Sequence, residues 1–212
     1  MFVSTEVRWF CSGSMPQRAL AWFSRVGQRP QEQPPRVDYY LDLGDYDSLG
    51  IKLREGRIEI KQREAWQGTV QLGTQFVGVM EQWRKWSWPL AEPDAGLAPG
   101  WISTASWIGV EKKRWLLRYQ AGREEEITLA PDGEAVEQGC QVELAQVQAQ
   151  GQVGWSLSFE SYRGEAVGRE TLLLVAAHLF SGESIDLPLS AEASYGYPKW
   201  LAMLGDRVRH PG

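Results

Sequence analysis

Polar and apolar residues alternate along much of this chain, and this pattern predicts a protein built mainly of strands. Residues 49–63 show it most clearly, as two short strands around a turn at Gly56, since glycine supplies the backbone freedom of a tight turn. Side chains of a strand point alternately to its two faces, so the charged residues of each strand share one face. This ionic face comprises Lys52, Arg54, Glu59, Lys61 and Arg63. Because a hairpin usually turns one face to the core and one to water, the ionic face is either solvated or the wall of a polyanion site.

The remaining elements are predicted from the same two periodicities. Alternation predicts strands at residues 3–10, 38–42, 107–119, 125–129, 140–147 and 154–160. Helical spacing of apolar residues predicts helices at residues 16–26, 70–88, 168–180 and 197–204. Residues 28–36 hold three prolines and are expected to form a loop, and residues 90–99 a linker within the domain. Hairpins at this spacing indicate an antiparallel sheet or barrel.

Length and composition favour one large all-β or α+β unit over two small domains. The chain has 212 residues, of which 43% are hydrophobic, which is enough for a core. A formal net charge of −5 argues against nucleic-acid binding by bulk electrostatics. Any anion must therefore be held by a local cluster of lysine and arginine in a concave site.

Several other classes of protein are not indicated. The longest apolar run, residues 172–180, is too short to span a bilayer, and the N-terminus has no secretory signal, so a cytoplasmic protein without membrane contact is expected. Cys11 and Cys140 are far apart and predict neither a disulfide framework nor a zinc site. His178 lies in an apolar predicted helix and is expected to be a packed or partly exposed residue of that helix, not a ligand. Neither common nucleotide-binding glycine loop occurs.

Later strands repeat the division into an apolar and an ionic face. Lys112, Arg114 and Arg118 share a face, Glu143 points away from its apolar neighbours, and Glu160 lies opposite Phe159. If the sheet is open, these faces are simply wet, since charged solvent faces are the rule. If it closes with these faces inward, they form a charged tunnel.

At this point the motifs resemble those of the CYTH, or triphosphate tunnel metalloenzyme, family. The matching segments, in order, are Asp38-Tyr-Tyr-Leu-Asp42, Gly50-Ile-Lys-Leu-Arg-Glu-Gly56, Ile58-Glu-Ile-Lys-Gln-Arg63, Val110-Glu-Lys-Lys-Arg-Trp115, Val142-Glu-Leu-Ala145, Trp155-Ser-Leu-Ser-Phe-Glu160 and Ser194-Tyr-Gly-Tyr-Pro-Lys-Trp-Leu201. The resemblance extends from residue 3 to about residue 201 and rests on the order of the segments, since no single one is specific.

The resemblance implies an α+β fold over residues 1–212, a single CYTH-like domain in which an eight-stranded antiparallel barrel with flanking helices encloses a charged tunnel. It also implies hydrolysis of a small-molecule triphosphate, inorganic or on a nucleoside or thiamine, with Mg²⁺ or Mn²⁺. Arginine and lysine suit this role because they neutralise phosphate oxygens, and a divalent ion with oxygen ligands would stabilise developing charge. By position, the phosphate contacts would be Arg8, Lys52, Arg54, Lys61, Arg63, Lys112 and Arg114. The metal ligands would be Glu6, Glu143 and Glu160, with Glu6 and Glu160 also assigned to catalysis and Glu59 balancing the cations.

The acidic half of this pattern is incomplete. The family's Glu-x-Glu-x-Lys motif reads Ser4, Glu6 and Arg8 here, while Ser158 and Ala145 stand where further carboxylates would be expected. A serine hydroxyl is a poorer Mg²⁺ ligand than a carboxylate. We therefore favour a triphosphatase and keep as an alternative a barrel that binds a phosphorylated ligand or a protein without turnover. A third hypothesis is an unrelated lipocalin-like barrel with an apolar interior.

Overall fold

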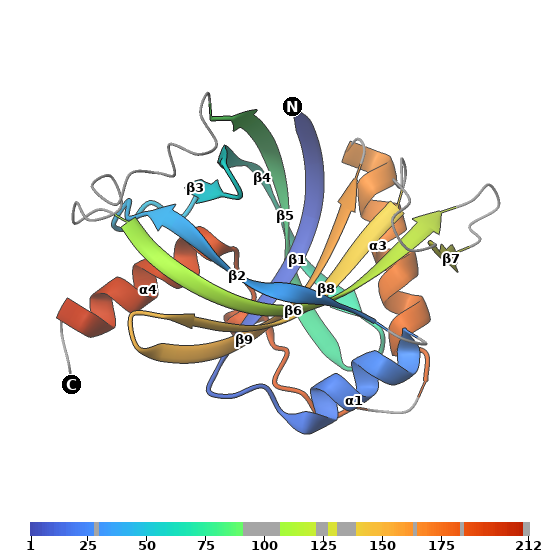
Figure 1. The fold of residues 1–212 in the computed structure, drawn as a ribbon. Coiled ribbons are helices and arrows are strands. Elements are labelled where there is room, and N and C mark those ends of the chain that lie inside the picture. The colour runs from blue at the N-terminus through green and yellow to red at the C-terminus, as the bar shows by residue number, and fades with distance from the viewer. Residues whose placement is uncertain are drawn as a thin grey trace.

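The computed structural model describes residues 1–27, 30–90, 107–121, 127–130, 139–162, 165–182 and 185–209. Within these ranges the chain forms a closed barrel with helices on its outside and at one end (Figure 1). The strands are β1 (Phe2–Ser12), β2 (Gln31–Leu41), β3 (Leu49–Arg54), β4 (Arg57–Leu72), β5 (Phe76–Pro89), β6 (Trp107–Ala121), β7 (Ile127–Leu129), β8 (Gly139–Ala149) and β9 (Gln152–Tyr162). The helices are α1 (Gln17–Val26), α3 (Glu165–Phe180) and α4 (Tyr197–Arg209), with a short 3₁₀ turn at Ala191–Ala193.

Eight of these strands close the barrel, and all their pairings are antiparallel. Their order is β2-β3-β4-β5-β1-β9-β8-β6, and β6 pairs back with β2. The short β7 is a ninth strand that pairs with the end of β6. The α+β fold with an eight-stranded antiparallel barrel and flanking helices is thus confirmed.

A first core lies outside the barrel wall. The outward residues of β1, such as Val7 and Trp9, are fully buried beneath α1 and α3. Trp22 of α1 stacks on Phe180 of α3, with ring centroids 5.4 Å apart. Because this apolar surface faces the helices, the alternate residues of the same strands point into the barrel.

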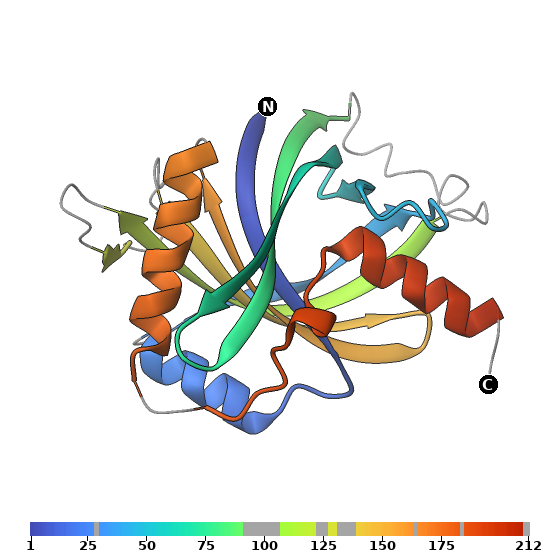
Figure 2. The ribbon, with the colours of Figure 1, turned by 180° about the vertical axis from the view of Figure 1, so that it is seen from behind.

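The inward face changes from ionic to apolar toward one end. On β1 the inward residues run from Glu6 and Arg8 to Phe10, which is buried in a second core with Trp200 and Leu204 of α4. The Trp200 ring stacks on Phe10 at a centroid distance of 4.9 Å. Helix α4 therefore fills this end of the barrel, on the side away from α1 and α3 (Figure 2).

The hairpin of residues 49–63 is confirmed with its turn. Residues 54 and 57 are the last pair of the β3–β4 ladder, so the loop has two residues, Glu55 and Gly56. Both have positive φ, 49° and 69°, as a two-residue hairpin turn that follows the strand twist requires. The strands expected at 3–10, 38–42, 107–119, 140–147 and 154–160 are present, as are the helices expected at 16–26, 168–180 and 197–204.

Two predicted elements are wrong. Residues 70–88 do not form a helix but the end of β4 and most of β5, where residues 78–83 are buried on both faces and polar–apolar alternation disappears. The loop expected at 28–36 is instead strand from Gln31 onward. The prolines of β2 are tolerated because its register with β6 shifts between Gln33 and Arg36, so no regular ladder bond is lost there.

Two expectations fall partly outside the described residues. The linker at 90–99 does so except for Leu90, and the strand at 125–129 is described only as β7. Among the described helices, none has the length and apolar character needed to cross a membrane.

Candidate functional site

The interior of the barrel contains a cavity of about 550 Å³. Its described lining carries nine lysines and arginines against five glutamates. The cations are Arg8, Arg36, Lys52, Arg54, Lys61, Lys85, Lys112, Arg114 and Arg118, and the glutamates are Glu6, Glu55, Glu59, Glu143 and Glu160. Although the whole chain has a net charge of −5, this cavity is cationic.

Ten of the eleven residues singled out from the sequence line this cavity, and Arg63 does not. The guanidinium of Arg63 is instead paired with Glu81 at 2.8 Å and with Asp47 at 2.6 Å. It also lies over the Trp83 ring, 5.8 Å from the centroid. Arg63 lies on the ionic face as expected, but its side chain pairs with Glu81 and Asp47 instead of lining the cavity.

One group of charges joins β1, β8 and β6. Arg8 is buried and donates from Nε to Glu6 at 2.6 Å and from Nη1 to Glu143 at 3.2 Å. Glu143 also accepts from Arg114 Nη1 at 3.4 Å. Burial raises the cost of ionising Glu143, but Arg8, Lys112 and Arg114 outweigh this effect and lower its pKa. Glu143 is therefore an anion held between two arginines.

A second contact joins β1, β4 and β9. Glu6 and Glu160 are directly opposite in the β1–β9 register, and the ammonium of Lys61 contacts both carboxylates, Glu160 at 3.1 Å. The Ser4 hydroxyl donates to the same Glu160 oxygen at 2.9 Å. Burial alone would raise the pKa of Glu160, whereas Lys61, Lys85 and Arg8 lower it to about 2.

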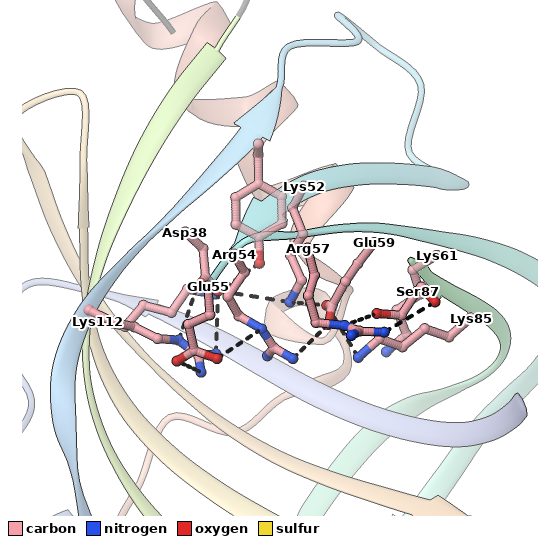
Figure 3. A network of polar contacts seen from close by, with 12 residues as sticks. Asp38, Lys52, Arg54, Glu55, Arg57, Glu59, Lys61, Lys85, Ser87 and Lys112 are labelled. Carbon is pink, nitrogen blue, oxygen red and sulfur yellow. Dashed lines mark hydrogen bonds and ion pairs between the residues drawn. The ribbon is translucent and has the colours of Figure 1, made fainter. Parts of the chain in front are cut away.

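The third group lies across β6, β2, β3, β4 and β5, and Figure 3 shows its residues side by side along the wall. Asp38 is fully buried and is paired with Lys112 at 2.8 Å and Arg36 at 2.9 Å. Glu59, also buried, is paired with three cations: Lys52 at 3.0 Å, Arg54 at 2.6 Å and Lys85 at 3.2 Å. The balancing role expected for Glu59 matches these contacts.

Two lysines of this third group have a lowered pKa, so their charged forms are disfavoured. Burial is the main cause that lowers the pKa of Lys52, and nearby Lys112 and Arg54 act in the same direction. Together they bring the pKa to about 7, against the opposite effect of Asp38 and Glu59. Burial likewise lowers the pKa of Lys112 to about 8, against the effect of Asp38 and Glu143. The carboxylates present do not fully compensate these ammonium groups, which an added anion would stabilise.

The floor of the cavity is the first turn of α4. Tyr197 lies beneath two cations, with Lys112 Nζ 3.8 Å and Arg8 Cζ 4.9 Å from its ring centroid. Its ring stacks on Tyr40 at 5.3 Å. Such cation–π contacts hold the cationic groups at the closed end of the barrel.

Sequence reasoning missed Asp38, Arg36 and Lys85 as site residues. Asp38 and Arg36 are two apart on β2, so they share its inward face, but the loop expected at 28–36 hid that spacing. Lys85 is opposite Lys61 in the β4–β5 ladder and was hidden by the predicted helix. Asp38 already lay in the strand predicted at 38–42, and assignment of the full strands β2 and β5 is the signal that would have placed Arg36 and Lys85 on the charged face with it.

The expected metal ligands do not form a fitting donor set. Glu6, Glu143 and Glu160 are each paired with a protein cation, Arg8 or Lys61. Among the residues that the structure describes, no group of three histidine, cysteine, aspartate or glutamate side chains is placed to hold a metal ion. Mg²⁺ needs oxygen ligands in near-octahedral geometry, so the Mg²⁺ or Mn²⁺ expected from the sequence stays a prediction that this arrangement does not favour.

Comparison with known proteins leaves the chain without a family assignment. No protein-family model matches it, and no curated protein matches it. Among solved structures it is similar to the PH1819 protein from Pyrococcus horikoshii OT3, with a TM-score of 0.45 and 11% sequence identity, over 96% of this chain and 99% of that chain. The site is therefore interpreted from its own residues.

Proposed function

We propose that this protein binds a small, phosphate-rich anion, such as a triphosphate-containing molecule, inside the barrel. The observation that carries the proposal is the excess of cations in a walled cavity, whose described lining has nine lysines and arginines against five glutamates. Its volume, about 550 Å³, lies within the range of ordinary small-molecule sites. A polyanion is the ligand class that offsets this excess.

The state of the individual cations supports the same ligand class. Burial lowers the pKa of Lys52 to about 7, so its charged form is poorly stabilised in the free protein. The buried Nε atoms of Arg54 and Arg114 have no hydrogen-bond partner within the part of the chain that the structure describes. Buried donors without partners are costly, and phosphate oxygens are good acceptors for guanidinium groups.

The resemblance of the strand motifs to triphosphate tunnel metalloenzymes supports the choice of a triphosphate. Metal-dependent hydrolysis, which that resemblance implies, has less support here because Glu6, Glu143 and Glu160 are each engaged by Arg8 or Lys61. We therefore place binding without metal-dependent turnover ahead of hydrolysis. We derive no catalytic step through a metal.

The test is a calorimetric titration with tripolyphosphate, with sulfate as a smaller anion for comparison. Lys112→Met is the test variant, because this ammonium lies in the cavity wall and pairs with Asp38 at 2.8 Å. Lys113→Met is the matched control, because the next residue points outward, is half-exposed and pairs with Glu32. We expect Lys112→Met to weaken binding by about tenfold or more, the scale of a lost charge-assisted contact, and Lys113→Met to change little.

Absence of tripolyphosphate binding to the wild-type protein, or equal losses in the two variants, would refute the proposal. A phosphate-release assay with tripolyphosphate, ATP and thiamine triphosphate, with and without Mn²⁺, tests turnover separately. Release by the wild-type protein that disappears in Glu160→Gln would restore the hydrolase hypothesis.

A further inference from the structure

We propose that Lys61 and Arg8 are permanent counter-cations of the carboxylates on β1, β8 and β9. They take the place between the carboxylates that a divalent ion would have, so the barrel binds its anion free of metal. The part about the anion rests on the proposed function. The part about the carboxylates can be tested without it.

Lys61 bridges two carboxylates that face each other across neighbouring strands. Glu6 and Glu160 are directly opposite in the β1–β9 ladder. The Lys61 ammonium contacts Glu6 Oε2 and lies 3.1 Å from Glu160 Oε1. Two carboxylates that share one cation are a common arrangement around a divalent ion, but here the cation is covalently attached to β4.

Arg8 lies between Glu6 and Glu143 and contacts both carboxylates. Its Nε donates to Glu6 Oε1 at 2.6 Å, so both oxygens of that carboxylate contact a protein cation. Its Nη1 donates to Glu143 at 3.2 Å and to the Ser156 hydroxyl at 3.3 Å. Arg8 is only 7% exposed, and a guanidinium so placed cannot leave the site without uncovering buried charges.

The serines of this region are also consistent with a site that has no divalent ion. Ser4 and Ser158 lie on the inward face of β1 and β9, opposite Tyr162 and Arg8 in the ladder. A carboxylate at either position would add negative charge for a divalent ion to neutralise. With serines there, the charges already present balance locally without a metal.

A divalent ion should consequently weaken anion binding at this site instead of contributing to it. Mg²⁺ bound to tripolyphosphate removes two negative charges from the ligand, which weakens its attraction to the cationic wall. It also brings a positive charge toward Lys61 and Arg8. We expect tripolyphosphate to bind tighter in EDTA than in excess Mg²⁺, by on the order of tenfold.

The carboxylates themselves are tested with Mn²⁺ alone, followed by its electron paramagnetic resonance signal. The test variant is Lys61→Met, which frees Glu6 and Glu160 from their shared ammonium. The matched control is Lys113→Met, which removes an equal charge from a half-exposed lysine that pairs with Glu32 on the outside of the barrel. We expect the wild-type protein and Lys113→Met to leave the free-ion signal unchanged, and Lys61→Met to reduce it as Mn²⁺ binds.

Bound Mn²⁺ in the wild-type protein, or no bound Mn²⁺ in a folded Lys61→Met protein, overturns the inference. So does tripolyphosphate binding that requires Mg²⁺, although that result leaves the proposed function intact. Absence of tripolyphosphate binding under both conditions refutes the proposed function, while the Mn²⁺ signals still decide the assignment of Lys61. If circular dichroism shows that Lys61→Met does not fold, the wild-type Mn²⁺ signal and the EDTA titration decide.

Discussion

Anion binding in this barrel should be accompanied by proton uptake, because one cavity lysine is only partly protonated at neutral pH. The pKa of Lys52 is lowered to about 7 by burial and by neighbouring cations. Its ammonium lies 3.0 Å from Glu59 and 3.8 Å from Asp38, which already serve other cations. A polyphosphate beside Lys52 would favour the charged form and raise its pKa toward the usual value.

The number of protons taken up follows from this shift in the pKa of Lys52. At pH 8, Lys52 is about one-tenth protonated when free and almost fully protonated once the bound anion returns its pKa to near the ordinary value of 10.5, so about 0.9 proton is taken up. At pH 6 the same residue is already about nine-tenths protonated and takes up only about 0.1 proton. Lys112, with a pKa lowered to about 8, adds about 0.5 proton at pH 8. Affinity should therefore fall as the pH rises above 7.

The assay is calorimetry at pH 8 in two buffers whose ionisation enthalpies differ, which gives the number of protons taken up per anion bound. Lys52→Met is compared with the wild-type protein, and Lys113→Met serves as the control because that lysine is half-exposed on the outside of the barrel. The ionisation of the ligand itself cancels in the difference between proteins. We expect uptake in Lys52→Met to be lower than in the wild-type protein by about 0.9 proton at pH 8, and by about 0.1 proton at pH 6.

Equal proton uptake in Lys52→Met and the wild-type protein at pH 8 would refute this reasoning. A difference that is larger at pH 6 than at pH 8 would refute it as well, because it would place the pKa of Lys52 on the wrong side of neutrality.

Four further predictions concern stability and the cavity wall. Asp38→Asn should lower the free energy of unfolding by about 3–5 kcal/mol, since it leaves buried cations uncompensated, and saturating tripolyphosphate should reduce that loss in chemical denaturation. The low pKa of Asp38 stabilises the fold above about pH 4 and this contribution is lost as the pH falls further, so acid denaturation should be shallower in Asp38→Asn. Arg54→Ala should weaken tripolyphosphate binding about ten- to a hundredfold in calorimetry, while Arg18→Ala, on the outside in α1, should not. Trp200→Ala should cost about 3–5 kcal/mol in chemical denaturation, because its indole fills the closed end of the barrel; a loss below 1 kcal/mol would argue against this packing.

Strand alternation predicted the fold well where one face of a strand is ionic and the other apolar. The hairpin at 49–63 is such a case, with Leu53 buried and Lys52 facing the cavity. Strand alternation did not predict β5, where Met80, Glu81 and Trp83 are all buried because both faces of the strand are covered. No local pattern distinguishes such a strand from a helix, since the covering elements come from distant parts of the chain.

The candidate site was predictable as a set of residue types, but not as a set of pairs. The spacing of the charged residues showed which face of each strand carries charge. Ten of the eleven residues chosen in this way line the cavity. That Arg8 pairs with Glu143, or that Lys61 bridges Glu6 and Glu160, depends on registers between strands far apart in sequence. Register is set by the closed barrel as a whole, so the charge pairing could not be read from any one strand.

The position of β1 between β5 and β9 has a consequence for how the chain is made. Its partner β9 follows about 140 residues later in the sequence. At ribosomal rates this separation corresponds to on the order of ten seconds or more of synthesis. During that interval Arg8 has neither Glu143 nor Ser156 beside it, because both lie on strands that emerge late. The charge network that defines the interior is thus among the last parts to assemble, and long-range strand pairing sets the pace of folding.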